Sequence, residues 1–278
     1  MSSNPPLHAA SPTPPLVVER LVKHFNAPRG TFLALDDVSF ELARGEFVSI
    51  VGPSGCGKST LFSMIGGLTP IDRGRIHVEG REVAGPHPAI GLVFQEESTF
   101  PWRTVEDNVM FPMEVRGTEP TERRRRAHHF IEMVGLTGFE KHYPRQLSGG
   151  MRQRVAIART LAFEPKVLMM DEPFAALDEQ TRLLLGERIL GIQQELQQTT
   201  LLITHNISEA VQLSDRVILM TYRPGRIKRI IDIGLGRPRS AEIMSDPASM
   251  RYVAEIWADL REETQGGRAD RAPQGGRS

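Results

Sequence analysis

Short apolar runs, separated by longer amphipathic segments, dominate the middle and the second half of the chain. These runs, rich in Val, Ile, Leu and Met, cover residues 47–51, 90–94, 167–170, 200–204 and 216–220. Continuous apolar runs of this length are typical of buried parallel strands, and the segments between them have the period of crossover helices. The pattern predicts an α/β fold with a mostly parallel sheet.

Two other segments have different patterns. Residues 16–46 alternate apolar and polar positions and contain turn residues, which predicts an N-terminal antiparallel β subdomain. Between residues 100 and 146 the strand-like runs disappear, and helix-period segments and loops take their place. We therefore expect an inserted α-helical subdomain at about residues 100–160, within one main domain that covers residues 16–235.

The two ends of the chain read as extensions of this domain. Residues 1–15 are rich in Pro and Ser, and residues 265–278 are polar and Gly-rich, so we expect both tails to be disordered. Residues 236–264 form a C-terminal helical extension in this interpretation. Its expected buried face consists of Met250, Val253, Ile256, Trp257 and Leu260.

Composition narrows the classes of function. The chain of 278 residues has 34 basic and 34 acidic side chains, so its zero net charge gives no general attraction to nucleic acid. Its single cysteine, Cys56, excludes a disulfide framework and fits a reducing compartment. We find no secretory signal and no apolar run approaching the roughly 18 residues that span a bilayer. Any membrane role is therefore expected to require a partner.

Residues 52–59, with the sequence GPSGCGKS, match the pattern G-x-x-x-x-G-K-[ST] between an expected strand and an expected helix. In such a P-loop the glycines let successive backbone N–H groups face a phosphate, a lysine reaches the β- and γ-phosphates, and a serine binds Mg²⁺. A merely structural Gly-rich turn is the alternative. The expected nucleotide-binding residues are Gly52, Pro53, Ser54, Gly55, Cys56, Gly57, Lys58, Ser59 and Thr60. A P-loop thiol is also expected to be reactive, unless it is buried and inert.

Polar residues follow three of the expected buried strands. Asp171 and Glu172 end the run VLMMDE, and we expect them beside the P-loop, since open parallel sheets bind ligands at the carboxyl ends of their strands. Asp171 is the expected Mg²⁺ carboxylate and Glu172 the expected base for the attacking water. Gln95 and His205 occupy corresponding positions after their own strands. By itself, a lone histidine is more often structural than catalytic.

A second anion-binding corner follows about ninety residues later. In LSGGMRQR (147–154), Ser148, Gly149 and Gly150 precede a helical run, and the free N–H groups of a helix N-terminus favour an anion. The P-loop at residues 52–59 already supplies a phosphate site, so the purpose of this second anion-binding corner is not evident from one chain.

Together, GPSGCGKST, FQ, LSGGMRQR, VLMMDEP, ALD (176–178) and TH (204–205) resemble the nucleotide-binding subunit of an ABC transporter over about residues 16–235. The resemblance implies ATP and Mg²⁺ as ligands, Phe25 stacked on adenine, and catalytic roles for Glu172, His205 and Gln95. Gln95 is also implied as a metal ligand and as the link to the permease, while Asp178 belongs to a dimer-contact loop. It further implies a head-to-tail homodimer, in which each LSGG closes over the ATP of the partner.

The fifth signature residue, usually Gln, is Met151 here. With residues 101–109 and 222–227, this departure resembles the nitrate, sulfonate and taurine importer branch. That branch implies integral membrane permease subunits, a periplasmic or surface solute-binding protein, and a peripheral position on the cytoplasmic face of the cell membrane. Residues 96–108, with Trp102 as anchor, are expected to receive a cytoplasmic helix of the permease.

Two other functions remain open at this point. A soluble ABC-type ATPase acting on ribosomes or DNA usually carries two cassettes or a long coiled-coil insert, and this chain has one P-loop and no such insert. A P-loop kinase or GTPase leaves LSGG unexplained, and the chain lacks a guanine-reading Asn-Lys-x-Asp motif.

Overall fold

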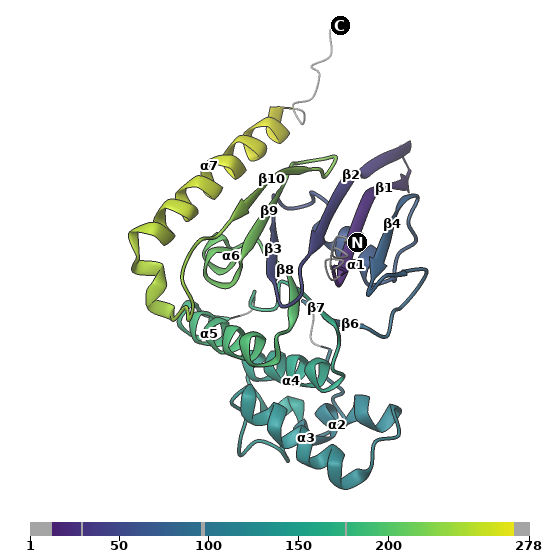
Figure 1. Ribbon diagram of the computed structural model, residues 1–278, viewed down its shortest axis with the longest axis vertical. Helices are drawn as coiled ribbons and strands as arrows, with labels where there is room; N and C mark the ends of the chain where they lie inside the picture. Colours follow the sequence, from purple (N-terminus) through teal and green to yellow (C-terminus); the bar gives the residue numbers. More distant parts are fainter. Residues whose placement is uncertain (1–12, 29, 96–97, 176, 270–278) are drawn as a thin grey trace, which may run out of the picture.

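A six-stranded sheet forms the centre of the protein, as the computed structural model shows for residues 13–28, 30–95, 98–175 and 177–269 (Figure 1). The four inner pairings are parallel and only the β10–β9 pairing is antiparallel, which confirms the predicted mostly parallel core. The strands, in sheet order, are β10 (Ile227–Asp232), β9 (Arg216–Met220), β3 (Phe47–Val51), β8 (Thr199–Ile203), β7 (Val167–Asp171) and β6 (Ile90–Val93).

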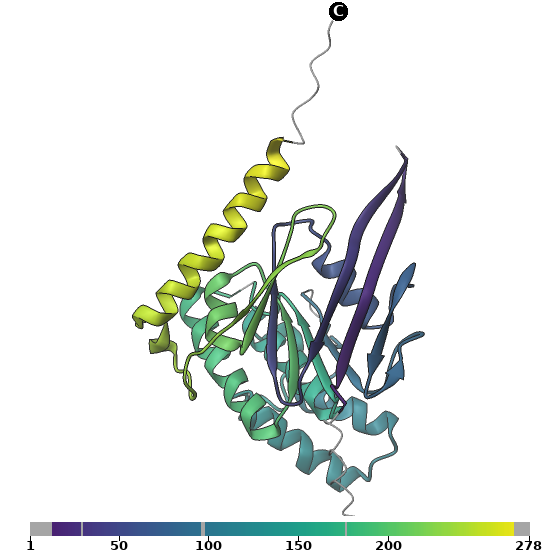
Figure 2. The same cartoon turned by 45° about the horizontal axis from the view of Figure 1, so that its top comes forward.

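A second, antiparallel sheet covers one side of this core, as predicted for the N-terminal segment. Helix α1 (Lys58–Ile65) lies between the two sheets and buries apolar side chains against both (Figure 2). Its four apolar residues, Leu61, Phe62, Met64 and Ile65, are all buried in this position. The strands of the second sheet, in order, are β2 (Gly30–Leu42), β1 (Leu16–Ala27), β4 (Arg73–Val78) and β5 (Arg81–Glu82).

The predicted helical insertion lies at one end of the molecule, at the bottom of Figure 1. Thr104 caps the first helix by accepting a hydrogen bond from the Asp107 N–H, and Pro120 begins the second, where its missing N–H costs nothing. This region is built from α2 (Val105–Val115), α3 (Pro120–Met133), the short 3₁₀ helix η1 (Pro144–Gln146) and α4 (Gly149–Ala162).

The C-terminal half adds α5 (Glu179–Leu196), α6 (Ile207–Leu213), the 3₁₀ helix η2 (Ala241–Ser245) and α7 (Pro247–Ala269). The predicted face of α7 is partly wrong. Ile256 is fully buried, with Val253 and Leu260 packed beside it, whereas Met250 and Trp257 are 56% and 62% exposed. A helix lying along the edge of a sheet buries only a narrow stripe, and Trp257 is turned about 100° from Ile256. Tyr252 packs in that stripe instead.

Helix α7 also continues to Ala269, beyond residue 264, where we predicted the helical extension to end. The Gly-Gly pair at residues 266–267 has low helix propensity and suggested the earlier end, yet the helical backbone passes through it. Residues 1–12 and 270–278, most of the two predicted tails, lie outside the described residues. None of the helices in the described ranges is both long enough and apolar enough to span a bilayer.

Candidate functional site

The P-loop lies between β3 and α1 and curls around the side chain of Lys58. The buried Lys58 Nζ donates hydrogen bonds to the carbonyl oxygens of Gly52 at 2.8 Å and Pro53 at 3.1 Å. Gly57 caps α1 with φ +104°, and a Cβ there would lie 2.7 Å from Leu35 Cδ2. Only glycine fits this conformation and this close approach, so the local sequence sets the shape of the loop.

The two predicted carboxylates lie at the carboxyl end of β7, beside the P-loop. Asp171 is buried, and its Oδ1 has no hydrogen-bond partner among the described residues. Burial raises the pKa of the Asp171 carboxyl, while a hydrogen bond from the Ser59 side chain opposes this by lowering it. A buried acceptor of this kind, next to a serine hydroxyl, provides oxygen ligands suited to Mg²⁺.

Glu172 and His205 are in direct contact. His205 Nδ1 lies 3.0 Å from Glu172 Oε2, and the two side chains are 61% and 20% exposed. Glu172 has φ +45°, and its N–H donates to the Ile203 carbonyl at the end of β8. Gln95 follows β6 at the same edge of the sheet, because β6 pairs in parallel with β7, and its side chain is exposed. The carboxyl edge thus brings Glu172 and His205 together beside the P-loop cavity, whereas Gln95 follows the outermost strand of that edge and does not line the cavity.

A cavity of about 290 Å³ opens beside these groups. The ring of the predicted adenine-stacking residue, Phe25, lies at this cavity and stacks on Phe32 with centroids 5.8 Å apart. Phe32 and Arg223 were not among the residues we predicted. The register of β1 and β2 places Phe32 directly opposite Phe25, so a correct hairpin alignment would have found it. The cavity is lined by Phe25, Phe32, Ala34, Ser54, Gly55, Gly57, Lys58, Ser59, Thr60, Glu172 and Arg223.

The second predicted corner does not reach this cavity within one chain. Ser148 caps α4, and its Oγ accepts a hydrogen bond from the Met151 N–H at 3.2 Å. Gly150 packs against Leu177, whereas a Cβ at Gly149 would meet only Arg152 Nη2, at 3.7 Å. None of Ser148, Gly149 and Gly150 lines the cavity beside the P-loop. The corner therefore presents its open backbone away from the phosphate site of its own chain.

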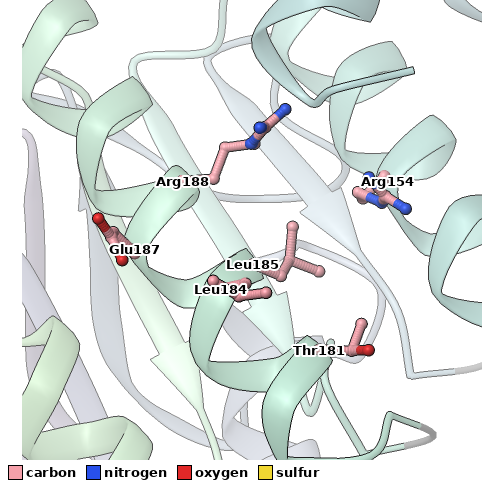
Figure 3. Close-up of a pocket in the computed structure, with 6 residues that line it drawn as sticks. All are labelled: Arg154, Thr181, Leu184, Leu185, Glu187 and Arg188. Carbon is pink, nitrogen blue, oxygen red and sulfur yellow. The ribbon is translucent and has the colours of Figure 1, made fainter. Parts of the chain in front are cut away.

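Another cavity, of about 590 Å³, contains none of the predicted site residues (Figure 3). It lies between α4 and α5, and Arg154 and Arg188 project into it. Arg154 Nη1 donates to the Val134 and Gly135 carbonyls just past the end of α3. Burial, followed by the charge of Arg188, lowers the pKa of Arg154. Cations are stabilised at a helix C-terminus, so Arg154 joins α4 to the end of α3 within the helical subdomain.

Cys56 differs from the expectation of a reactive thiol. Its side chain is fully buried, and its Sγ lies 4.0 Å from Lys58 Nζ. Burial raises the pKa of the Cys56 thiol, an effect larger than the opposing influence of the Lys58 charge. Thiolate formation is therefore suppressed at neutral pH, and the alternative of an inert thiol is the one that the structure supports.

We expect N-ethylmaleimide at pH 7 to label folded Cys56 at least about tenfold more slowly than the unfolded chain, because both access and thiolate formation are reduced. Mass spectrometry of samples quenched over time, with and without guanidinium chloride, measures the two rates. Since Cys56 is the only cysteine, the mass increase reports this site alone. Equal rates in the two samples would contradict the burial of the thiol.

Comparisons with known proteins point to the same kind of site, an ATP-binding one. Residues 35–175 match the family described as ABC transporter. An uncharacterised ABC transporter ATP-binding protein of Methanocaldococcus jannaschii is 51% identical over 224 residues, which are 81% of this chain and 84% of that protein. The nitrate import ATP-binding protein NrtD of Synechocystis is 44% identical over 260 residues, 90% of this chain and 98% of that protein.

A third relative is the aliphatic sulfonates import ATP-binding protein SsuB of Bacillus cereus, 42% identical over 80% of this chain and 88% of its own. Among solved structures, the chain is similar to a dimeric ATP-binding cassette in a post-hydrolysis state with bound ADP and phosphate. The TM-score is 0.71 at 31% identity, over 80% of this chain and all of the solved one.

Proposed function

This chain belongs to the ABC transporter family, and we propose that it is the ATP-hydrolysing subunit of an importer for nitrate, a sulfonate, taurine or a similar small solute. One observation carries the proposal: a P-loop, two strand-end carboxylates and a histidine meet at one edge of the sheet, while the LSGG corner faces away. The similarity to nitrate and sulfonate import proteins supports the choice of solute class.

In this proposal the residues of the P-loop hold the phosphates of ATP. The Lys58 ammonium exchanges its bonds to the Gly52 and Pro53 carbonyls for bonds to phosphate oxygens, which supply a full negative charge. Ser59, Asp171 and Gln95 are the residues that would hold Mg²⁺, and the unpartnered Asp171 Oδ1 supports this assignment. When bound, Mg²⁺ would neutralise part of the phosphate charge.

Glu172 is the proposed base that accepts a proton from the attacking water. Its carboxylate lies at the cavity, and its backbone is fixed by the hydrogen bond to Ile203. His205 Nδ1 lies 3.0 Å from the Glu172 carboxylate, so His205 is proposed to position Glu172 for the proton transfer.

The purpose of the second corner follows from pairing two copies of the chain head to tail. Ser148, Gly149 and Gly150 then close over the ATP held by the P-loop of the partner, with the N-terminus of α4 directed at its phosphates. The open space around Gly149 supports this arrangement, because a phosphate must approach bare backbone there. The similarity to a cassette solved as a dimer is consistent with it.

An apolar groove on the helical subdomain is the proposed docking site for a cytoplasmic helix of the permease. Its cavity, of about 350 Å³, is lined by residues of β6, α2 and α4 and by the flanking Phe100 and Phe163; three of its side chains are phenylalanines, Phe100, Phe111 and Phe163. Trp102 is 73% exposed and stacks on Phe100 with ring centroids 5.6 Å apart. Residues 96 and 97 of the predicted docking segment lie outside the described residues. The groove is also lined by residues of β6, the strand that Gln95 follows along the chain.

Replacing Trp102 by Ala is expected to reduce recovery of the permease at least about tenfold, because an exposed aromatic anchor contributes strongly to an interface. ATP hydrolysis by the isolated chain should stay within about twofold of wild type, since Trp102 lies outside the ATP cavity. The matched control is Trp257→Ala, which removes the other, similarly exposed tryptophan from α7. Equal loss in both variants, or in neither, would contradict the assignment.

Affinity purification of the tagged chain from detergent-solubilised membranes of its own host tests the function as a whole. We expect multi-span permease subunits in the eluate, and ATP hydrolysis that increases when the solute-binding protein and its solute are added. Such a complex would place the chain peripherally on the cytoplasmic face of the membrane. Recovery with ribosomes or DNA in place of a permease would instead support the soluble ABC-type ATPase.

A further inference from the structure

The turn between β9 and β10, residues 221–226, lies directly against the P-loop. A Cβ at Gly225 would stand 2.0 Å from the Cys56 carbonyl oxygen, so this position requires glycine for the turn to approach so closely. The Gly225 N–H donates to the Ala34 carbonyl, and the Gly225 carbonyl accepts from the Asp36 N–H. The turn is therefore held between β2 and the P-loop and forms one wall of the nucleotide cavity.

Arg223 extends from this wall into the cavity. Its Nε donates a hydrogen bond of 2.8 Å to the Gly55 carbonyl of the P-loop, and its guanidinium lies 5.6 Å from the centre of the Phe32 ring. The same cavity is lined by Lys58 and Glu172. A guanidinium has five N–H donors, and the bond to Gly55 uses only one of them.

The neighbouring contacts fix the turn but leave the charge of Arg223 available. The Tyr222 N–H donates to Glu263 of α7, and Arg226 pairs with Asp36 of β2. In the described part of the chain, Arg223 forms no ion pair with a carboxylate of the kind that Arg226 forms. A rigid turn thus presents an uncompensated positive charge beside the loop that holds phosphates.

We infer that Arg223 is a further nucleotide-binding residue, which supplies a second positive charge to the polyphosphate of ATP from outside the P-loop. The inference rests on the proposed ATP site. Lys58 contacts the phosphates from within the loop, whereas Arg223 approaches from the β9–β10 turn and holds the Gly55 carbonyl at the same time. Charge-assisted bonds from a planar guanidinium are directional, so Arg223 also restricts where the phosphates lie.

Calorimetric titration with Mg²⁺ and the non-hydrolysable ATP analogue AMP-PNP tests this inference. We expect Arg223→Gln to weaken binding about tenfold at about 50 mM NaCl, and the difference to shrink at about 300 mM, because salt screens a partly exposed charge. Arg223→Lys should recover part of the loss, since it retains the charge without the planar fork. Arg226→Gln, in the same turn but paired with Asp36, is the matched control and should bind like wild type.

Melting temperatures, measured on all variants, separate a loss of binding from a loss of folding. Affinity of folded Arg223→Gln within about twofold of wild type at both salt concentrations would overturn the inference. Equal, salt-independent losses in Arg223→Gln and Arg223→Lys would also overturn it, because the side chain would then only shape the turn. Failure of the wild-type chain to bind AMP-PNP, with Lys58→Ala as reference, would reject the proposed ATP site itself.

Discussion

Glu172→Gln is expected to lower ATP hydrolysis at least about a hundredfold while leaving the affinity for ATP within about twofold of wild type. The amide has nearly the shape of the carboxylate, but it cannot accept the proton of the attacking water. The bond from the Glu172 N–H to the Ile203 carbonyl holds the backbone and does not depend on the side chain, so the substitution removes charge without disturbing the loop.

Phosphate release and calorimetric titration, carried out on the same preparation, measure the two quantities for this variant. Glu195→Gln is the matched control, because it makes the same chemical change at an exposed position near the end of α5. Glu195 does not line the cavity. Turnover near the wild-type rate in Glu172→Gln would remove Glu172 as the base. Loss of ATP affinity together with turnover would instead assign it a binding role.

The sequence predicted the core strands because buried parallel strands have continuous apolar runs, such as residues 167–170 and 200–204. Strand β10 was not predicted, since its charged residues Lys228 and Arg229 interrupt the apolar pattern. Their charges are compensated by acidic residues of α7, an arrangement that only the tertiary structure shows. The buried stripe of α7 depends likewise on how the helix lies on the sheet edge.

Some residues of the candidate site could be predicted from the sequence, and others could not. The P-loop and the strand-end carboxylates could be predicted because a strand, a loop and a helix that are contiguous in sequence determine their geometry. Arg223 reaches the site only through the pairing of its turn with β2, which no local pattern indicates. The sequence could not decide between a reactive and a buried Cys56, because the motif describes the backbone of the loop and not the packing beneath it.

The proposed head-to-tail dimer can be tested with two damaging substitutions, Lys58→Ala and Gly149→Asp. Their effect depends on whether they lie in the same chain or in different chains. If each ATP lies between Lys58 of one chain and Gly149 of the other, Lys58→Ala in one chain and Gly149→Asp in its partner damage the same site. The second site of that dimer then remains whole. When both substitutions are in one chain and the partner is wild type, each site carries one lesion.

Gly149→Asp is suited to this test because its effect is expected on the partner. The space around Gly149 accommodates a side chain, and an aspartate in the first turn of α4 is favourable to its own helix. In a composite site, however, the same carboxylate adds bulk and negative charge where the phosphates of the partner's ATP must approach. Each chain is therefore expected to fold normally, with the loss confined to shared sites.

ATP occlusion in the two tagged and purified heterodimers is the most direct test of a composite ATP site shared by two chains. We predict that the dimer with one lesion in each chain occludes about half as much ATP as wild type, and that the dimer with both lesions in one chain occludes almost none. If each chain instead built its own complete site, the order would reverse. Higher occlusion in the dimer with both lesions in one chain would contradict the composite site.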